Sequence, residues 1–338
     1  MTPILVSVLM WALAAVLLIL RRGRADRSIT YSAVTIAVAM TLNIDAVYIW
    51  VDSFLGGTNV ATLVADIPLM VGIFFLGRGV AKVTQDKRRV VQIALGRTLL
   101  VIALAGVAAS FLLIDRGSTT TTFMLDLGAQ PAAAAYSIIQ FAYDGVIVTA
   151  MAATAGRHIR QSRGADRLPA ISLLIGSLSG LALSIVIIAM DSAHLAGNLG
   201  LMSGLSAAYD PLFLSTFVFL CLGLAGQPAL RWARARSRAR STRALVDRVA
   251  PIWERASHVR PGLSQYSAGF AAEDAETQLH RQVVEIRDAV IDPRVRFELS
   301  DDERAMVDEA EAHLIGRRGV ESNGGEVSAR SGRPRPAQ

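Results

Sequence analysis

Residues 132–155 read AAAAYSIIQFAYDGVIVTAMAATA, an apolar stretch with one ionisable carboxyl group, Asp144, near its centre. The hydrocarbon core of a bilayer is about 30 Å thick, and about 20 helical residues cross it. The stretch is therefore long and apolar enough to predict a helix that spans a membrane.

Six further stretches have the same character, so the sequence predicts an all-α fold: a seven-helix transmembrane bundle with a small cytosolic helical domain. In chain order the seven predicted spans are Pro3–Leu20, Ile29–Val51, Thr58–Leu76, Val91–Ile114, Ala132–Ala155, Leu168–Met190 and Tyr209–Gly226.

The composition agrees with this prediction, because 52% of the 338 residues are hydrophobic and only 18% are charged, against about 25% charged in soluble domains. No Glu occurs before Glu254, and the 108 residues from Arg231 onward hold 36 of the charged side chains. A soluble enzyme, a disulfide-rich secreted protein and a disordered chain all fit poorly. The single cysteine, Cys221, leaves no intramolecular disulfide and no cysteine-based zinc site.

Basic residues alternate between the loops and predict the orientation. Loops one, three and five, with Arg97, hold fourteen of them, whereas loops two, four and six hold only Arg116. Because Lys and Arg concentrate on the cytoplasmic side, the N-terminus is predicted outside and the C-terminus inside a cell membrane. Since the arginines follow the first span, that span is predicted to be a retained anchor and not a cleaved signal peptide.

Three aspartates within the predicted spans are the residues that indicate a functional site. A charged side chain at the bilayer centre costs at least about 2.5–3.5 kcal/mol, so its presence asks for a reason. Asp144 lies near the middle of span five, Asp66 lies just before Pro68 in span three, and Asp45 follows Asn43 in span two. These four polar residues, Asn43, Asp45, Asp66 and Asp144, are the candidate ion, proton or substrate site; the alternative is that each aspartate bonds only to nearby polar side chains.

Span six carries small residues at intervals of four, which place them on one face of a helix: Ser172, Gly176, Gly180 and Ser184. Such a face lets a neighbouring helix approach closely, and packing within the chain is favoured over dimerisation.

Catalytic motifs are missing from the sequence. Tyr143-Asp144 matches half of the intramembrane aspartyl protease pattern, but span six has no Gly-x-Gly-Asp. The five histidines are scattered, and neither a Gly-x-Ser-x-Gly elbow nor a phosphate-binding loop is present. No enzymatic activity, cofactor or metal site is predicted.

After the last span, residues 229–250 are predicted to form a basic juxtamembrane helix, following the transmembrane domain at 1–228. Its side chains either contact anionic lipids of the inner leaflet or serve only as a stop-transfer flank that fixes the topology; they are Arg231, Trp232, Arg234, Arg236, Arg238 and Arg240. Nucleic-acid binding is not expected, because stacking aromatic residues are missing.

Residues 251–318 are predicted to form the cytosolic domain. Three apolar stripes are predicted, the first of which starts in the juxtamembrane segment: Leu245, Val249, Ile252, Trp253 and Ala256; Leu279, Val283, Ile286 and Val290; and Met306, Ala310 and Leu314. Ser300-x-x-Glu303 predicts a capping box at the start of the last helix, and Gly316 its end. The tail at 319–338 is predicted to be disordered.

The chain resembles a family of actinobacterial seven-span membrane proteins that are classed as transporters and carry a C-terminal cytosolic domain of unknown function. The similar segments are Ala250-Pro251-Ile252-Trp253, residues 279–288 (LHRQVVEIRD) and Ala65-Asp66-Ile67-Pro68. Within residues 279–288, His280 and Gln282 depart from the family pattern. The resemblance implies a multi-pass protein without implying a substrate.

Two functional hypotheses follow. In the first, the protein is a transporter coupled to a proton or cation through the buried aspartates. In the second, it is a membrane sensor or scaffold whose cytosolic domain, around Leu279–Val290, binds a cytosolic partner. A pulldown with the isolated domain that finds only the protein itself would count against this hypothesis. A homo-oligomer formed through the same domain is the alternative. A third, weaker hypothesis is a lipid-binding assembly factor that uses the basic segment.

Overall fold

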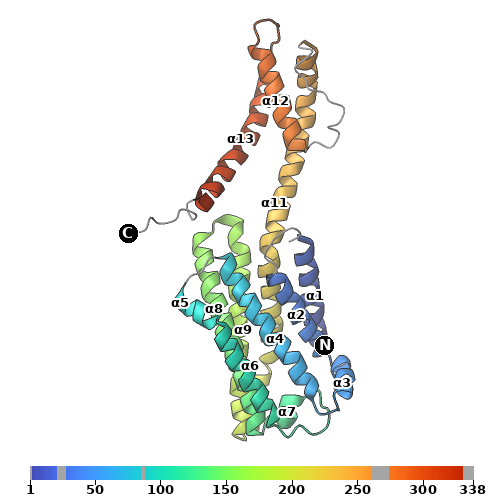
Figure 1. Cartoon of the computed structure of the whole chain (residues 1–338), viewed down its shortest axis with the longest axis vertical. Helices are drawn as coiled ribbons and strands as arrows, with labels where there is room; N and C mark the ends of the chain where they lie inside the picture. The colour runs from blue at the N-terminus through green and yellow to red at the C-terminus, as the bar shows by residue number, and fades with distance from the viewer. Residues whose placement is uncertain (1, 21–27, 85–87, 260–273, 330–338) are drawn as a thin grey trace, which may run out of the picture. The chain divides into compact units, whose positions relative to one another are not determined.

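A computed structural model describes residues 2–20, 28–84, 88–259 and 274–329, with side chains described as far as Gly316. In these ranges the chain is helical and contains no strand (Figure 1). The α-helices are α1 (Thr2–Leu20), α2 (Ser28–Leu42), α3 (Asp45–Phe54), α4 (Val60–Val83), α5 (Arg89–Ala94), α6 (Arg97–Leu112), α7 (Phe123–Leu127), α8 (Pro131–Gln161), α9 (Arg167–Leu195), α10 (Leu199–Ser206), α11 (Tyr209–Val259), α12 (Ala275–Ile291) and α13 (Asp301–Ala329).

The chain divides into two compact units, Met1–Arg231 and Trp232–Gln338, which we call the first and second unit. The boundary between the two units, at Arg231, lies close to the predicted end of the transmembrane domain at residue 228. Helix α11 contributes to both cores, with Phe217, Leu220 and Leu224 in the first and Leu245 and Val249 in the second. The segment predicted as a juxtamembrane helix, 229–250, therefore supplies part of the second unit's core.

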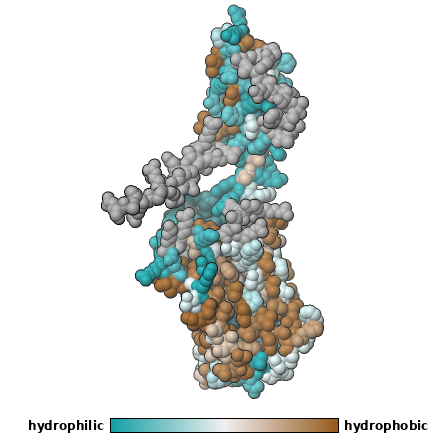
Figure 2. All heavy atoms as spheres, in the orientation of Figure 1, coloured by the Kyte–Doolittle hydropathy of each residue, from teal (hydrophilic) through white to brown (hydrophobic). Residues whose placement is uncertain are grey.

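The first unit is a bundle whose surface is apolar. Large hydrophobic side chains project outward from several helices, including Ile19, Val101, Ile185 and Leu222, each more than half exposed. Figure 2 shows hydrophobic residues over most of the visible face of this unit. An apolar surface of this extent fits a lipid environment and not water. Six helices are long and apolar enough to cross a membrane, or seven if one bent pair counts as a single span.

The bent pair corrects the prediction of one continuous helix over Ile29–Val51. Helices α2 and α3 meet at an angle of 85°. At the break, the amide of Asn43 donates to the carbonyl of Ala39 (3.0 Å), and Asp45 opens α3. An Asn side chain competes with the backbone for hydrogen bonds, and an acidic residue is favourable at a helix N-terminus, so both side chains favour a break here.

Span four is also interrupted, although its two helices together still form one candidate span, Arg89–Leu112. Helix α5 ends before Gly96, whose backbone is extended with ψ 143°. A Cβ atom at Gly96 would lie 2.9 Å from the carbonyl oxygen of Ile93. Only glycine fits this close turn without displacing the backbone.

In the second unit, α11, α12 and α13 bury their apolar stripes together. The centre of this core consists of five fully buried side chains: Val249, Leu279, Ile286, Val307 and Ala310. The stripe of α12 differs from the prediction in one place, because Ala289 is buried whereas Val290 is 40% exposed.

The last helix begins as predicted. The backbone N–H of Ser300 donates to Glu303 Oε2 (3.0 Å), and the backbone N–H of Glu303 donates to Ser300 Oγ (3.3 Å), which is a reciprocal capping box. Helix α13 runs to Ala329, beyond the end predicted at Gly316. No proline lies between Asp301 and Pro334, so the glycine alone does not stop the helix. The rest of the predicted disordered tail, 330–338, lies outside the described residues.

Candidate functional site

The site is built around Asp144, in the middle of α8. This aspartate is 6% exposed, and its Oδ1 atom has no hydrogen-bond partner among the described residues. The hydroxyl of the adjacent Tyr143 also lacks a partner there. A buried carboxyl oxygen without a donor is costly when ionised, so Asp144 is suited to carrying a proton or binding a cation.

Asp66 faces α8 from α4. Its Oδ2 accepts a hydrogen bond from the hydroxyl of Tyr136 (2.5 Å), and the side chain of Gln140 interacts with the same carboxyl group. The Asp66 and Asp144 carboxyl groups are close enough to interact electrostatically. Pro68, inside α4, has no N–H to donate to the carbonyl of Val64 and so weakens the helix beside Asp66.

The spacing of residues along α8 explains how these groups meet. Tyr136, Gln140 and Asp144 recur at intervals of four and so share one helix face. All three are buried, and α4 is one of the neighbours of α8. The result is a line of polar side chains inside an otherwise apolar core.

Helices α3 and α7 lie at one end of the first unit (Figure 1), which we call the α7 end. Aromatic rings border the line of polar side chains at this end. The ring centroid of Tyr136 lies 5.7 Å from that of Phe111 and 6.2 Å from that of Phe123. The guanidinium of Arg116 lies 4.9 Å from the Phe111 ring centroid. Both phenylalanines are buried, so they separate the Tyr136–Asp66 hydrogen bond from this end.

The predicted residues Asn43 and Asp45 do not lie with Asp66 and Asp144. Asp45 is exposed on the first turn of α3, and Asn43 is half-buried with its amide bonded to α2. The break between α2 and α3 is the reason, since a continuous helix would have carried Asp45 into the core region of the bilayer.

A second buried carboxylate, Asp52, was missed by the sequence reasoning. It is 0% exposed and accepts from the backbone N–H of Asn59 (2.9 Å), the backbone N–H of Ala61 (3.0 Å) and the hydroxyl of Thr119 (2.6 Å). Asp52 therefore caps the N-terminus of α4 from a neighbouring helix. The sequence feature that could have indicated this capping role is the turn-forming run Gly56-Gly57-Thr58-Asn59 that follows Asp52. In the structure, Asn59 has a φ of 61°.

The same loop cluster holds Asp126, whose carboxyl accepts from the hydroxyls of Thr120 and Thr122. These hydrogen bonds, first that of Thr120, hold the pKa of Asp126 below its usual value. The loop that precedes α7 is thus held by side-chain hydrogen bonds.

Asp191, at the end of predicted span six, is buried as well. The residue is only 6% exposed, and its Oδ2 lacks a partner within the described residues. The side chain of Ser137, on α8, lies beside it. Its burial depends on how α8 and α9 pack, so the sequence held no local signal for it.

The small residues of α9 lie against helices of the same chain. A Cβ atom on Gly176 would lie 2.7 Å from the backbone nitrogen of Leu220, and one on Gly180 would lie 3.2 Å from Thr216, both on α11. Further along, Ser184 lies against Gly145 of α8, and Ser172 is half-buried.

The basic segment on α11 is mostly exposed. Arg231, Arg236 and Arg240 are exposed, and the Arg236 guanidinium lies 5.4 Å from the ring centroid of Trp232. Arg238 differs, since it donates to the backbone carbonyl of His313 on α13 (3.1 Å) within the second unit. Arg238 is therefore less available to lipid than predicted.

No protein-family model matches this chain, and no curated protein or solved structure matches it. The resemblance to the seven-span family stays an expectation from the sequence.

Proposed function

We propose that the protein is a seven-span transporter of the cell membrane, with its N-terminus outside and its C-terminus in the cytoplasm, that couples to a proton or small cation through Asp66 and Asp144. The observation that carries the proposal is Asp144: a carboxyl group buried in a long apolar helix, with one oxygen unpartnered and a second carboxyl group within electrostatic reach.

The physical argument is one of charge balance. Two neighbouring carboxylates, Asp144 buried and Asp66 half-buried, are costly to keep ionised together without a counter-charge, because desolvation and mutual repulsion add. A bound proton or cation supplies that charge. Tyr136 donates a hydrogen bond to Asp66, whereas one oxygen of Asp144 has no donor among the described residues, so Asp144 is the group that would take the proton or cation.

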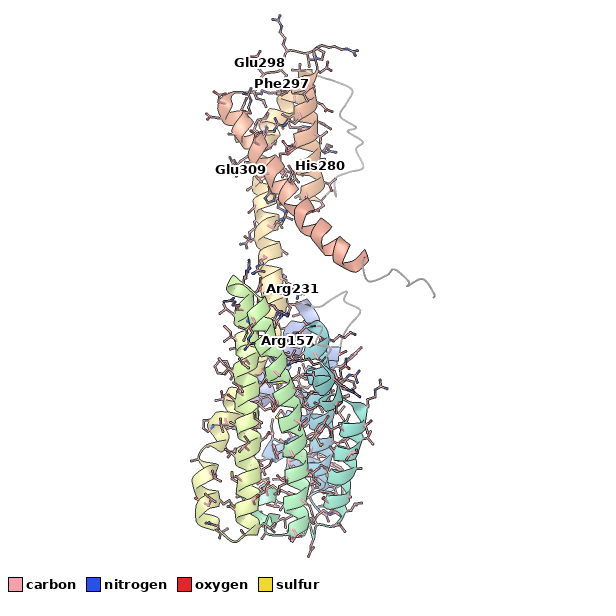
Figure 3. All side chains as sticks on the ribbon, turned by 90° about the vertical axis from the view of Figure 1, so that its left-hand side faces the viewer. Arg157, Arg231, His280, Phe297, Glu298 and Glu309 are labelled. Atoms are coloured by element: carbon pink, nitrogen blue, oxygen red, sulfur yellow. The ribbon has the colours of Figure 1, made fainter. Side chains whose placement is uncertain are left out.

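The distribution of basic residues supports the proposed orientation. Arg157 of α8 and Arg231 of α11 lie at the same end of the first unit (Figure 3), which we call the basic end. It is the end where the positive-inside rule puts the cytoplasm. The arginines of the first predicted loop and Lys87 lie outside the described residues.

The test is proton movement in proteoliposomes. With an imposed pH gradient, a trapped pH-sensitive dye and valinomycin with K⁺ for charge compensation, the wild type is expected to dissipate the gradient faster than protein-free vesicles. Asp144→Asn and Asp66→Asn each remove a carboxyl group while keeping its size, so both are expected to reduce the rate at least tenfold. Asp45→Asn is the matched control, since Asp45 is exposed, and is expected to keep the wild-type rate.

Wild-type rates in both Asp66→Asn and Asp144→Asn would contradict the proposal. So would a wild type that moves no protons and, in vesicles without valinomycin, catalyses no sodium or potassium flux.

A further inference from the structure

Two cavities follow the buried site along α8 toward the basic end of the first unit. Asp144, Met151 and His158 recur at intervals of seven, which keeps them close to one helix face. Met151 lines the first cavity and His158 the second. The cavities therefore lie along the same face of α8 as the candidate site.

The first, which we call the central cavity, has a volume of about 50 Å³. Its wall is apolar and draws on α1, α2, α4, α8 and α11; it includes Met10, Ile36, Ile73, Val148 and Cys221. Val148 is one helical turn from Asp144, so this end of the cavity lies about 6 Å along α8 from the buried residue.

The second, which we call the polar mouth, has a volume of about 40 Å³ and lies nearer the ends of α4 and α8. Its wall includes the half-buried His158 and Gln227, whose side-chain nitrogens are 3.1 Å apart. Leu224 lines both cavities and is buried. Its side chain is therefore part of the partition between them.

We propose that these two cavities are the access route by which water and protons reach Asp144 from the basic end, with Leu224 as the gate and the His158–Gln227 pair as its entrance. The proposal rests on the proposed function, because it assigns a path to the same carboxyl group. It goes further by naming the residues that control entry.

The sizes fit this role. A water molecule needs about 10–15 Å³ of cavity volume. Each cavity therefore has room for about three or four water molecules. An apolar cavity of this size favours the dry state, whereas a polar rim retains water. Displacement of one leucine side chain would join the polar mouth to the central cavity and let water pass, which is gating by wetting of a hydrophobic constriction.

Cys221 provides the test, because it lines the central cavity and is the only cysteine of the chain. Methanethiosulfonates react with the thiolate, which needs water to form. A membrane-impermeant trimethylammonium methanethiosulfonate is added to vesicles in which the second unit is accessible to added protease, so that the basic end of α11 faces the reagent. Intact-mass spectrometry then gives the rate of modification.

Leu224→Ala is expected to raise the modification rate at least tenfold, and only from that side. Leu222→Ala is the matched control: it removes the same atoms two residues away on the same helix, where the side chain is 55% exposed, and it is expected to react at the wild-type rate. Leu224→Val removes one methylene group, is more certain to fold, and is expected to give an intermediate rate.

Equal rates in the Leu224 variants and in Leu222→Ala, or faster modification from the opposite side, would overturn the route. The proton-flux assay is independent of this result. If Asp144→Asn abolishes flux while the Leu224 variants leave modification unchanged, the access route fails and the proposed function stands; if the reverse holds, the cavities admit water without serving coupled transport.

Discussion

At the residue scale, four aspartates of the first unit differ only in their surroundings. Asp45 is exposed, Asp52 is buried and accepts three hydrogen bonds, and Asp144 and Asp191 are buried with one oxygen unpartnered each. Hydrogen bonds from N–H groups compensate a buried carboxylate, so Asp52 has a structural explanation as a helix cap. Neither Asp144 nor Asp191 has a comparable set of donors. Asp144 differs from Asp191 in having the Asp66 carboxyl group within electrostatic range, and this difference singles it out as the functional candidate.

The hydrogen bond from Tyr136 to Asp66 yields a prediction at this scale. Tyr136→Phe removes the hydroxyl donor but keeps the ring that packs against Phe111 and Phe123. The free energy of unfolding is expected to fall by about 1–2 kcal/mol, and proton flux is expected to fall with it. Thermal unfolding in detergent and the vesicle assay measure the two effects.

Tyr31→Phe is the control for that substitution, because Tyr31 is 61% exposed. It is expected to match the wild type in both assays. If Tyr136→Phe also matches the wild type in both, the hydrogen bond contributes neither stability nor function.

At the element scale, the packing of α9 against α11 depends on glycine. In Gly176→Ala the new methyl group would meet the backbone of α11 at 2.7 Å, and a backbone atom cannot rotate away as a side chain can. The helices must separate, at an expected cost of about 1–3 kcal/mol. Thermal unfolding of the full chain in detergent measures this loss.

Gly156→Ala is the comparison, since no atom lies within 4 Å of a Cβ at Gly156 in α8. It is expected to be neutral, or stabilising by up to about 1 kcal/mol because alanine favours helix. Equal loss of stability in Gly156→Ala and Gly176→Ala would show that helix propensity, not close packing, decides the result.

The start of α13 predicts a pH dependence. Arg255 donates to the Glu303 carboxylate (2.6 Å), and this bond, with the capping-box bonds, holds the pKa of Glu303 below its usual value. Because the folded pKa is lowered, the stabilisation is present above the unfolded pKa and is lost as the pH falls through the lower, folded value.

Hydrogen exchange of the first turn of α13 measures this effect. Its protection relative to intrinsic exchange is expected to fall by about two- to fivefold below pH 4. In Glu303→Gln the protection is expected to be low at neutral pH and to lose this dependence. Glu309→Gln, at the half-exposed pair with Arg248, is expected to keep the wild-type profile; a fall that persists in Glu303→Gln would assign the dependence to another group.

At the scale of the whole molecule, the number of crossings decides on which side of the membrane the ends lie. Seven crossings put the two ends on opposite sides, whereas six crossings put them on the same side. The answer depends on whether α2 and α3 together form one broken span. Such a break is tolerated at membrane depth only where protein or a water-filled cavity surrounds it.

Reporter fusions settle this count. A green fluorescent protein fused after Gln338 is expected to fluoresce, and alkaline phosphatase fused before Met1 is expected to be active, because the first folds in the cytoplasm and the second outside it. Fusions that place both ends on one side would favour six crossings, with α2 and α3 forming a re-entrant segment.

The sequence by itself determined the all-helical class, the apolar stretches and the apolar stripes of the second unit, because hydropathy and helical periodicity are local properties. It also determined the capping box, which needs only Ser300 and Glu303, three residues apart. It did not determine that Asp191 and Asp52 are buried, that Asp45 is exposed, or that Asp66 meets Asp144. Burial depends on which helices become neighbours, and a helix face reveals its own periodicity but not the side chains that will cover it. The tertiary structure alone decided which carboxyl groups are buried and where the cavities lie.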